Sequence, residues 1–194
     1  MHPEDLLSPA EFQQLLIACK TSRERAMLLL LGGVGLRVSE VAGLKIEDLD
    51  IPAAYLYIRP DNSKGKKQRT CILSEAVIEA LSNYAENRTS GFVFEGRHSG
   101  HISTRQIETI LNEIAMRAEL QTTKSGRNRI TPHLLRHSFA IWTLEAGIDV
   151  GNLQQQLGHS SLATTGVYLR SRPNHRLEAY KRSGFDKLLR VQSE

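Results

Sequence analysis

Hydrophobic and polar positions follow a helical period along most of the chain, and polar capping residues mark where helices begin. The first start is the run Ser-Pro-Ala-Glu at residues 8–11, which has the residues of a capping box with proline at the first helical position. A second capping box at residues 21–24 precedes the apolar run 26–31, and the glycines at 32–33 end that helix. Further helices are expected over residues 38–44, 74–85, 103–118, 131–145, 149–157, from Ser161 to before Tyr168, and over residues 174–189.

The hydrophobic period changes in the middle of the chain. Residues 54–59 and 68–73 have the pattern of β-strands, and the basic turn 60–67 lies between them. Residues 44–49 are a candidate for a short third strand. The expected fold class is therefore mainly α with a small antiparallel β-sheet (α+β).

Length and composition predict one globular domain. The 194 residues are 40% hydrophobic and 24% charged, which suits a single domain over residues 1–194. The net charge of +4 permits a polyanionic partner without requiring one. No apolar run approaches the roughly 20 residues that span a bilayer, and residues 1–5 lack the basic start of a secretion signal. We expect a cytoplasmic protein in which Cys19 and Cys71 form no disulfide.

The helix expected from residue 131 carries two imidazoles and a guanidinium. His133, Arg136 and His137 are three and four positions apart, so they lie near one helical face. The alternative is a helix at the protein surface that carries a few histidines without a functional role, because it would show the same sequence pattern. His-x-x-x-His is also a metal-ligand spacing, but the zinc-protease pattern needs glutamate where Leu134 stands, and a cation between the imidazoles disfavours a dication. No metal site is expected.

A glycine-rich bend at residues 32–35 precedes Arg37. The bend does not match a dinucleotide-binding loop, because Val38 stands where the last glycine of that motif belongs. We expect the glycines to bring Arg37 close to the backbone of a partner. Glu40 is placed to orient the guanidinium of Arg37. The alternative is a surface ion pair, which contributes only a few tenths of a kcal/mol.

Five motifs together resemble one family, the tyrosine recombinases or phage integrases, which include the Xer proteins. The resemblance runs from about Leu7 to the tail and covers the family's catalytic domain, in the family's order and spacing. The motifs are Gly-Leu-Arg-Val-Ser-Glu at 35–40, Ser-Lys-Gly-Lys-Lys-Gln-Arg at 63–69, His-Leu-Leu-Arg-His-Ser-Phe-Ala at 133–140, Leu-Gly-His at 157–159, and Tyr168.

The resemblance implies a role for each motif. Arg37 and Arg136 would grip the scissile phosphate, for which the guanidinium fork is well suited. His133 would act as proton acceptor or phosphate ligand, and His159 would donate to a non-bridging oxygen. Tyr168 would be the nucleophile that forms a 3′-phosphotyrosyl bond. Because that bond stores the energy for ligation, no metal, ATP or other cofactor is implied.

The resemblance also implies roles for the basic segments. The family pattern makes Lys64 the acid that protonates the leaving 5′-oxygen, with Lys66 and Lys67 as rivals for phosphate contact. A basic turn is also, commonly, only a solubilising loop. His137 is expected to support the site rather than to react. The residues expected to contact DNA, or alternatively to solvate their loops, are Lys66, Lys67, Arg69, Lys124, Arg127 and Arg129.

The implied function is a site-specific DNA recombinase or integrase, acting in DNA recombination and DNA integration, as in mobile elements. Its partners would be a double-stranded DNA recombination site and other protomers in a tetrameric synapse, and it would be nucleoid-associated. Too few residues precede Gly35 for the family's additional N-terminal core-binding domain, so we expect the catalytic domain alone. The tail, residues 171–194, is expected to dock either on a neighbouring protomer or on the protomer to which it belongs. The alternatives are a type IB topoisomerase, in which lysine is common at the place of His133, or a telomere resolvase, and a non-catalytic DNA-binding remnant.

Overall fold

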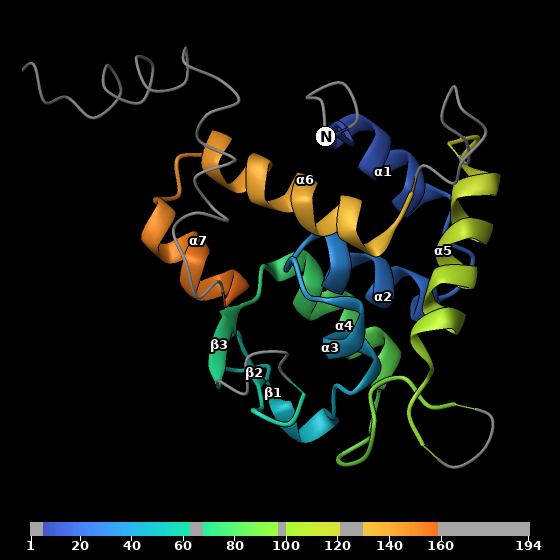
Figure 1. Ribbon diagram of the computed structural model, residues 1–194. Coiled ribbons are helices and arrows are strands. Elements are labelled where there is room, and N and C mark those ends of the chain that lie inside the picture. The colour runs from blue at the N-terminus through green and yellow to red at the C-terminus, as the bar shows by residue number, and fades with distance from the viewer. Residues whose placement is uncertain (1–5, 63–67, 97–99, 121–129, 159–194) are drawn as a thin grey trace, which may run out of the picture.

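The computed structural model describes residues 6–62, 68–96, 100–120 and 130–158 (Figure 1). Its helices and small sheet confirm the expected α+β class. In the described part of the chain, no helix is long and apolar enough to cross a membrane. The helices are α1 Pro9–Ile17, α2 Ser22–Gly32, α3 Val38–Ala42, α4 Glu75–Ala85, α5 Thr104–Arg117, α6 Pro132–Glu145 and α7 Val150–Leu157, and the strands are β1 Leu49–Asp50, β2 Tyr55–Ile58 and β3 Arg69–Ile72.

Capping residues start most helices where the sequence predicts. At α1, the Ser8 hydroxyl accepts from the Glu11 N–H and the Glu11 carboxylate accepts from the Ser8 N–H, which completes the capping box. Ser74 precedes α4 without a side-chain capping bond. The expected helix from Ser161 and the tail lie outside the described residues. Side-chain caps of the predicted kind also begin α2, α5, α6 and α7, at Thr21, Ser103, Thr131 and Asp149.

The sheet is antiparallel with strand order β1-β2-β3. β2 and β3 form the predicted hairpin, in which Tyr55 lies opposite Ile72. The third strand was predicted over residues 44–49, and this boundary is wrong. The Asp48 carboxylate accepts a hydrogen bond from the Lys45 N–H at 3.0 Å. This cap turns residues 46–48 into a 3-10 helix, so the strand begins only at residue 49.

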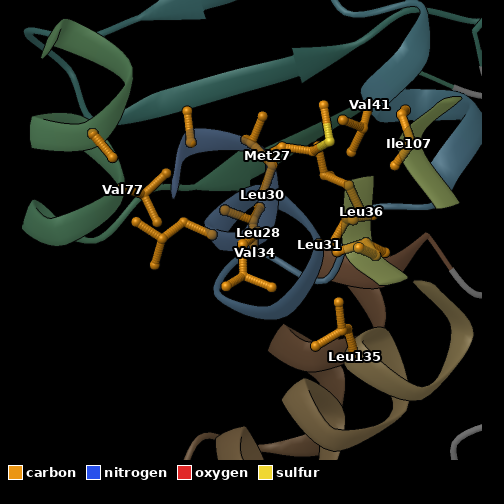
Figure 2. Packing of buried hydrophobic residues seen from close by; sticks show 14 of the residues in the cluster. Met27, Leu28, Leu30, Leu31, Val34, Leu36, Val41, Val77, Ile107 and Leu135 are labelled. Carbon is orange, nitrogen blue, oxygen red and sulfur yellow. The ribbon is translucent and has the colours of Figure 1, made fainter. Parts of the chain in front are cut away.

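The core surrounds α2, whose residues 26–32 are all buried. A helix that is apolar on all sides needs partners on all sides. Figure 2 shows Leu28, Leu30 and Leu31 of this helix packed among side chains from other elements. α4 contributes Val77, α5 Ile107 and α6 Leu135. The α2–α3 loop is therefore held between elements that are far apart in the sequence.

A smaller apolar cluster fixes α7. Leu153 and Leu157 pack with Ala140 of α6, and all three are buried. On its other side α7 lies against β3 (Figure 1). The end of α7 is thus placed between α6, the edge of the sheet and the α2–α3 loop, where the predicted site residues gather.

Candidate functional site

Arg37 stands at the N-cap position of α3, after the glycine bend. Gly35 has a φ of +76°, and a Cβ atom there would lie 2.4 Å from Cδ1 of Phe139. Both the backbone conformation and the close approach of α6 require glycine at this position. The bend therefore turns the chain directly into α3 beneath α6.

Glu40 makes the predicted contact with Arg37. Its carboxylate accepts from the Arg37 N–H and from Arg37 Nη1, each at 2.8 Å. Glu40 is fully buried, whereas the Arg37 side chain is 27% exposed. The alternative of a surface ion pair therefore does not hold, because the carboxylate has left water. The guanidinium of Arg37 stays within reach of a ligand.

Arg69 was predicted to contact DNA, and the structure turns its guanidinium into the protein instead. Nη1 and Nη2 donate to the two carboxylate oxygens of Glu40 at 2.8 and 2.7 Å. Nε donates to the main-chain carbonyl of Gln156 at 3.0 Å. Only 8% of the side chain is exposed. The sequence of β3 contains a signal for this burial. Side chains two positions apart on a strand lie on the same face of the sheet, and Arg69 is two positions from the fully buried Cys71.

Arg136 reaches the same place from α6. It is 7% exposed, and Nη1 lies 4.0 Å from the Glu40 carboxylate. Nη1 also donates to the carbonyl of Gly35, and Nη2 donates to the carbonyl of Leu157 at 2.7 Å. Arg37 and Arg136, the two arginines predicted to act together, are therefore brought to one carboxylate.

Glu40 and Arg69 shift each other's pKa. Burial opposes ionisation of Glu40, but the hydrogen bonds and charge of Arg69, with smaller contributions from Arg37, outweigh it and lower the carboxyl pKa. Burial likewise opposes the charge of Arg69, and Glu40 overcomes it and raises the pKa of Arg69. Among the described residues, the guanidinium groups of Arg37, Arg69 and Arg136 thus lie around the carboxylate of Glu40. Several positive groups in one place favour a bound anion.

The two histidines of α6, His133 and His137, differ in exposure. Their rings stack with centroids 6.3 Å apart. His133 is exposed in the first turn, while His137 is half-buried. Burial, and then the nearby His133, lower the pKa of His137. Within the described residues, no group of three His, Cys, Asp or Glu side chains is placed to hold a metal.

Several predicted residues lie outside the described part of the chain, as does the tail 171–194. Gly158, which immediately precedes His159, is described and ends α7 with a left-handed φ of 66°. Asn62, at the start of the β2–β3 turn, donates to the main-chain carbonyl of Glu40 at 3.0 Å. The predicted residues outside the described part are Lys64, Lys66, Lys67, Lys124, Arg127, Arg129, His159 and Tyr168.

Two contacts of this region have no clear signal in the sequence. One is the bond from Asn62 to Glu40. The other is the side chain of Gln156, which binds the backbone of Ile72 and Val34. Gln156 ends a run of three glutamines, and nothing in their type distinguishes it from Gln155.

Chemically, the described site suits a phosphate group. Arg37 is partly exposed, and both Arg37 and Arg136 approach the carboxylate of Glu40, so their positive charges can act on one oxyanion. His133 adds an exposed imidazole, whose nitrogens can form hydrogen bonds with a ligand. A pair of cations can stabilise the negative charge that develops in phosphoryl transfer.

Comparisons with known proteins give a consistent family. A model described as the phage integrase family matches residues 5–175. Tyrosine recombinase XerA of Pyrococcus furiosus is 39% identical over 166 residues, which cover 83% of this chain and 54% of the relative. Tyrosine recombinase XerC of Oceanobacillus iheyensis is 34% identical over 171 residues, which cover 83% of this chain and 53% of that protein. The chain therefore spans about half the length of these curated relatives.

Solved structures share the fold. The crystal structure of XerA recombinase aligns with a TM-score of 0.75 and 30% identity, over 92% of this chain and 65% of that one. XerH site-specific recombinase, bound to its difH substrate in a pre-cleavage complex, aligns with a TM-score of 0.72 over 93% of this chain and 54% of that one. Its identity is 22%, so this second likeness concerns the fold alone.

Proposed function

Because this chain belongs to the phage integrase family, we propose that it is a tyrosine-type site-specific DNA recombinase. It cleaves one strand of a DNA site, holds the end covalently and rejoins it to another strand. The observation that carries this proposal is the approach of Arg37 and Arg136 to the single carboxylate of Glu40. One phosphate placed there would meet both guanidinium groups.

The nucleophile in this proposal is Tyr168. Its phenolic oxygen forms a bond to phosphorus while the bond from phosphorus to the 5′-oxygen breaks. The products are a 3′-phosphotyrosyl ester and a 5′-hydroxyl, and the reverse attack by a 5′-hydroxyl restores the DNA. Because one phosphoester replaces another, the reaction requires no ATP.

The cations supply the electrostatic part of catalysis. Arg37 and Arg136 donate to the non-bridging oxygens, whose negative charge grows in the transition state. His159 donates to the same group, and His133 takes the phenolic proton or binds the phosphate. Lys64 protonates the leaving 5′-oxygen. These groups supply the positive charge that a metal ion supplies in other phosphoryl-transfer enzymes.

The partners follow from the reaction. The substrate is a double-stranded recombination site, and exchange of strands between two sites requires further protomers in a tetrameric synapse. Two solved relatives support a DNA substrate: XerH is described with its difH substrate and the Tn1549 transposon integrase with circular intermediate DNA. The chain supplies the catalytic domain, and its tail, residues 171–194, docks on a neighbouring protomer. A DNA substrate places the protein in the cytoplasm, at the nucleoid.

A covalent-adduct assay tests the proposal. The 194-residue chain is incubated with a pool of nicked DNA duplexes of randomised sequence, and protein-linked DNA is separated on a denaturing gel. We expect an adduct with the wild type and with Tyr180→Phe, but none with Tyr168→Phe. DNA binding without any adduct would favour the non-catalytic alternative. Relaxation of supercoiled plasmid without paired sites would favour a type IB topoisomerase.

A further inference from the structure

The side chain of Gln156 joins α7 to two distant segments. Its Oε1 accepts from the Ile72 N–H at 2.9 Å, and its Nε2 donates to the Ile72 carbonyl at 3.1 Å. The amide thus pairs with the outer edge of β3 as a peptide group of a further strand would. Nε2 also donates to the carbonyl of Val34, in the α2–α3 loop, at 3.3 Å.

The main chain of Gln156 takes part as well. Its carbonyl accepts from Arg69 Nε at 3.0 Å and from the thiol of Cys71 at 3.4 Å. Arg69 holds Glu40 with its other two nitrogens. Gln156 is therefore tied to the edge of the sheet by both its side chain and its backbone.

These contacts bear on Arg136, because they involve the residues next to its own partners. Arg136 donates to the carbonyls of Gly35 and Leu157. Gly35 follows Val34, and Leu157 follows Gln156. The bond between Gln156 and Val34 therefore links the same two backbone segments one residue earlier. This bond therefore fixes the distance between the carbonyls of Gly35 and Leu157, both of which accept hydrogen bonds from the guanidinium of Arg136.

We propose that Gln156 is a positioning residue, which holds the end of α7 against the α2–α3 loop so that Arg136 is fixed in the phosphate site. This assignment rests on the proposed function, in which Arg136 binds the scissile phosphate. Gln156 itself touches no reacting atom. Its loss displaces Arg136 without unfolding the chain, because Leu153 and Leu157 still anchor α7 in its apolar cluster.

The substitution that tests this is Gln156→Met, which keeps the length of the side chain and removes its hydrogen bonds. The matched control is Gln155→Met, the same change at the exposed neighbouring position. Nuclear magnetic resonance measures hydrogen exchange at the Ile72 N–H and at the guanidinium of Arg136 in the full chain. We expect exchange at both groups to accelerate about 10-fold in Gln156→Met and to stay unchanged in Gln155→Met.

The second readout is single-turnover adduct formation on the nicked DNA pool. We expect Gln156→Met to slow the reaction about 10- to 100-fold, with the Kd for DNA unchanged, because misplacement of a phosphate ligand affects the transition state. In an Arg136→Lys background, Gln156→Met should have little further effect on the rate. A purely structural defect would instead multiply with the loss from Arg136→Lys.

The outcomes separate this assignment from the proposed function. Unchanged exchange at the Arg136 guanidinium in Gln156→Met, or an unchanged rate of adduct formation, overturns the positioning role. Multiplicative rate losses in the double variant overturn it too. If the wild type forms no adduct, the proposed function fails, and exchange at Arg136 alone then decides whether Gln156 holds it.

Discussion

Arg69 donates two parallel hydrogen bonds to the carboxylate of Glu40, across a sequence separation of 29 residues. Both side chains are buried. The pair connects β3 to α3. The same carboxylate of Glu40 also accepts hydrogen bonds from the N–H and Nη1 of Arg37 and so holds Arg37 in place. Arg69, which the sequence suggested as a DNA contact, thus supports the site from within the protein.

Loss of Arg69 should destabilise the fold. Arg69→Met leaves the buried carboxylate of Glu40 without its main partner, and breaking such a pair costs about 3–5 kcal/mol. Arg105→Met, at an exposed position of α5, should change the free energy of unfolding by less than about 0.5 kcal/mol. Urea denaturation measures both. Equal stability of the two variants would show that the Arg69–Glu40 pair is not formed in solution.

The lowered pKa of Glu40 predicts a dependence of stability on pH. The folded carboxyl has a pKa below the ordinary value of 4.5, so the unfolded chain binds more protons in the interval between the two values. Its contribution to stability is complete above the ordinary value and is lost as the pH falls through the folded pKa. Urea midpoints measured from neutral to acid pH should fall more steeply for the wild type than for Glu40→Gln. Parallel curves would contradict this.

Gly35 should tolerate no side chain. Gly35→Ala places a Cβ against Phe139 at a φ of +76°, so strain and overlap together should cost about 2–5 kcal/mol. Gly147 has a φ of +92°, and a Cβ atom added there would have no described atom within 4 Å. Gly147→Ala therefore isolates the backbone strain and should cost about 1–3 kcal/mol. Thermal unfolding measures the loss of stability in both variants. An equal loss would show that the close approach of α6 adds nothing to the cost of Gly35→Ala.

Cleavage should proceed in the presence of a chelator. In the proposed reaction, guanidinium and imidazole groups neutralise the phosphate, so EDTA at millimolar concentration should leave the yield of covalent adduct unchanged. The adduct assay with and without added Mg²⁺ measures this. A requirement for Mg²⁺ in bond cleavage would point to a different chemistry at this site.

Local rules made much of this structure predictable from the sequence. Capping residues such as Ser8 and Thr131 act within three or four positions, and the contact of Glu40 with Arg37 spans three. The third strand was misplaced because the Asp48 cap competes locally with extended backbone.

The contacts that tie the site together depend on tertiary packing. Gln156 meets Ile72 across a separation of 84 residues, and Arg69 meets Glu40 across 29. No pattern within one element distinguishes Gln156 from the glutamines beside it. The resemblance to a family located Arg136, but it did not indicate what holds this residue, because Arg136 donates to the backbone carbonyls of Gly35 and Leu157, which only folding brings together.

The most direct test of the account is a double-substitution cycle on the rate of adduct formation, with Arg37→Lys, Arg136→Lys and both together. Lysine keeps the charge but loses the fork, so each single variant should react about 10²- to 10³-fold more slowly than the wild type, with DNA binding little changed. If both groups act on one phosphate, the double variant should lose clearly less than the product of the two single losses. A wild-type rate for either single variant, or fully multiplicative losses, would contradict a shared phosphate site.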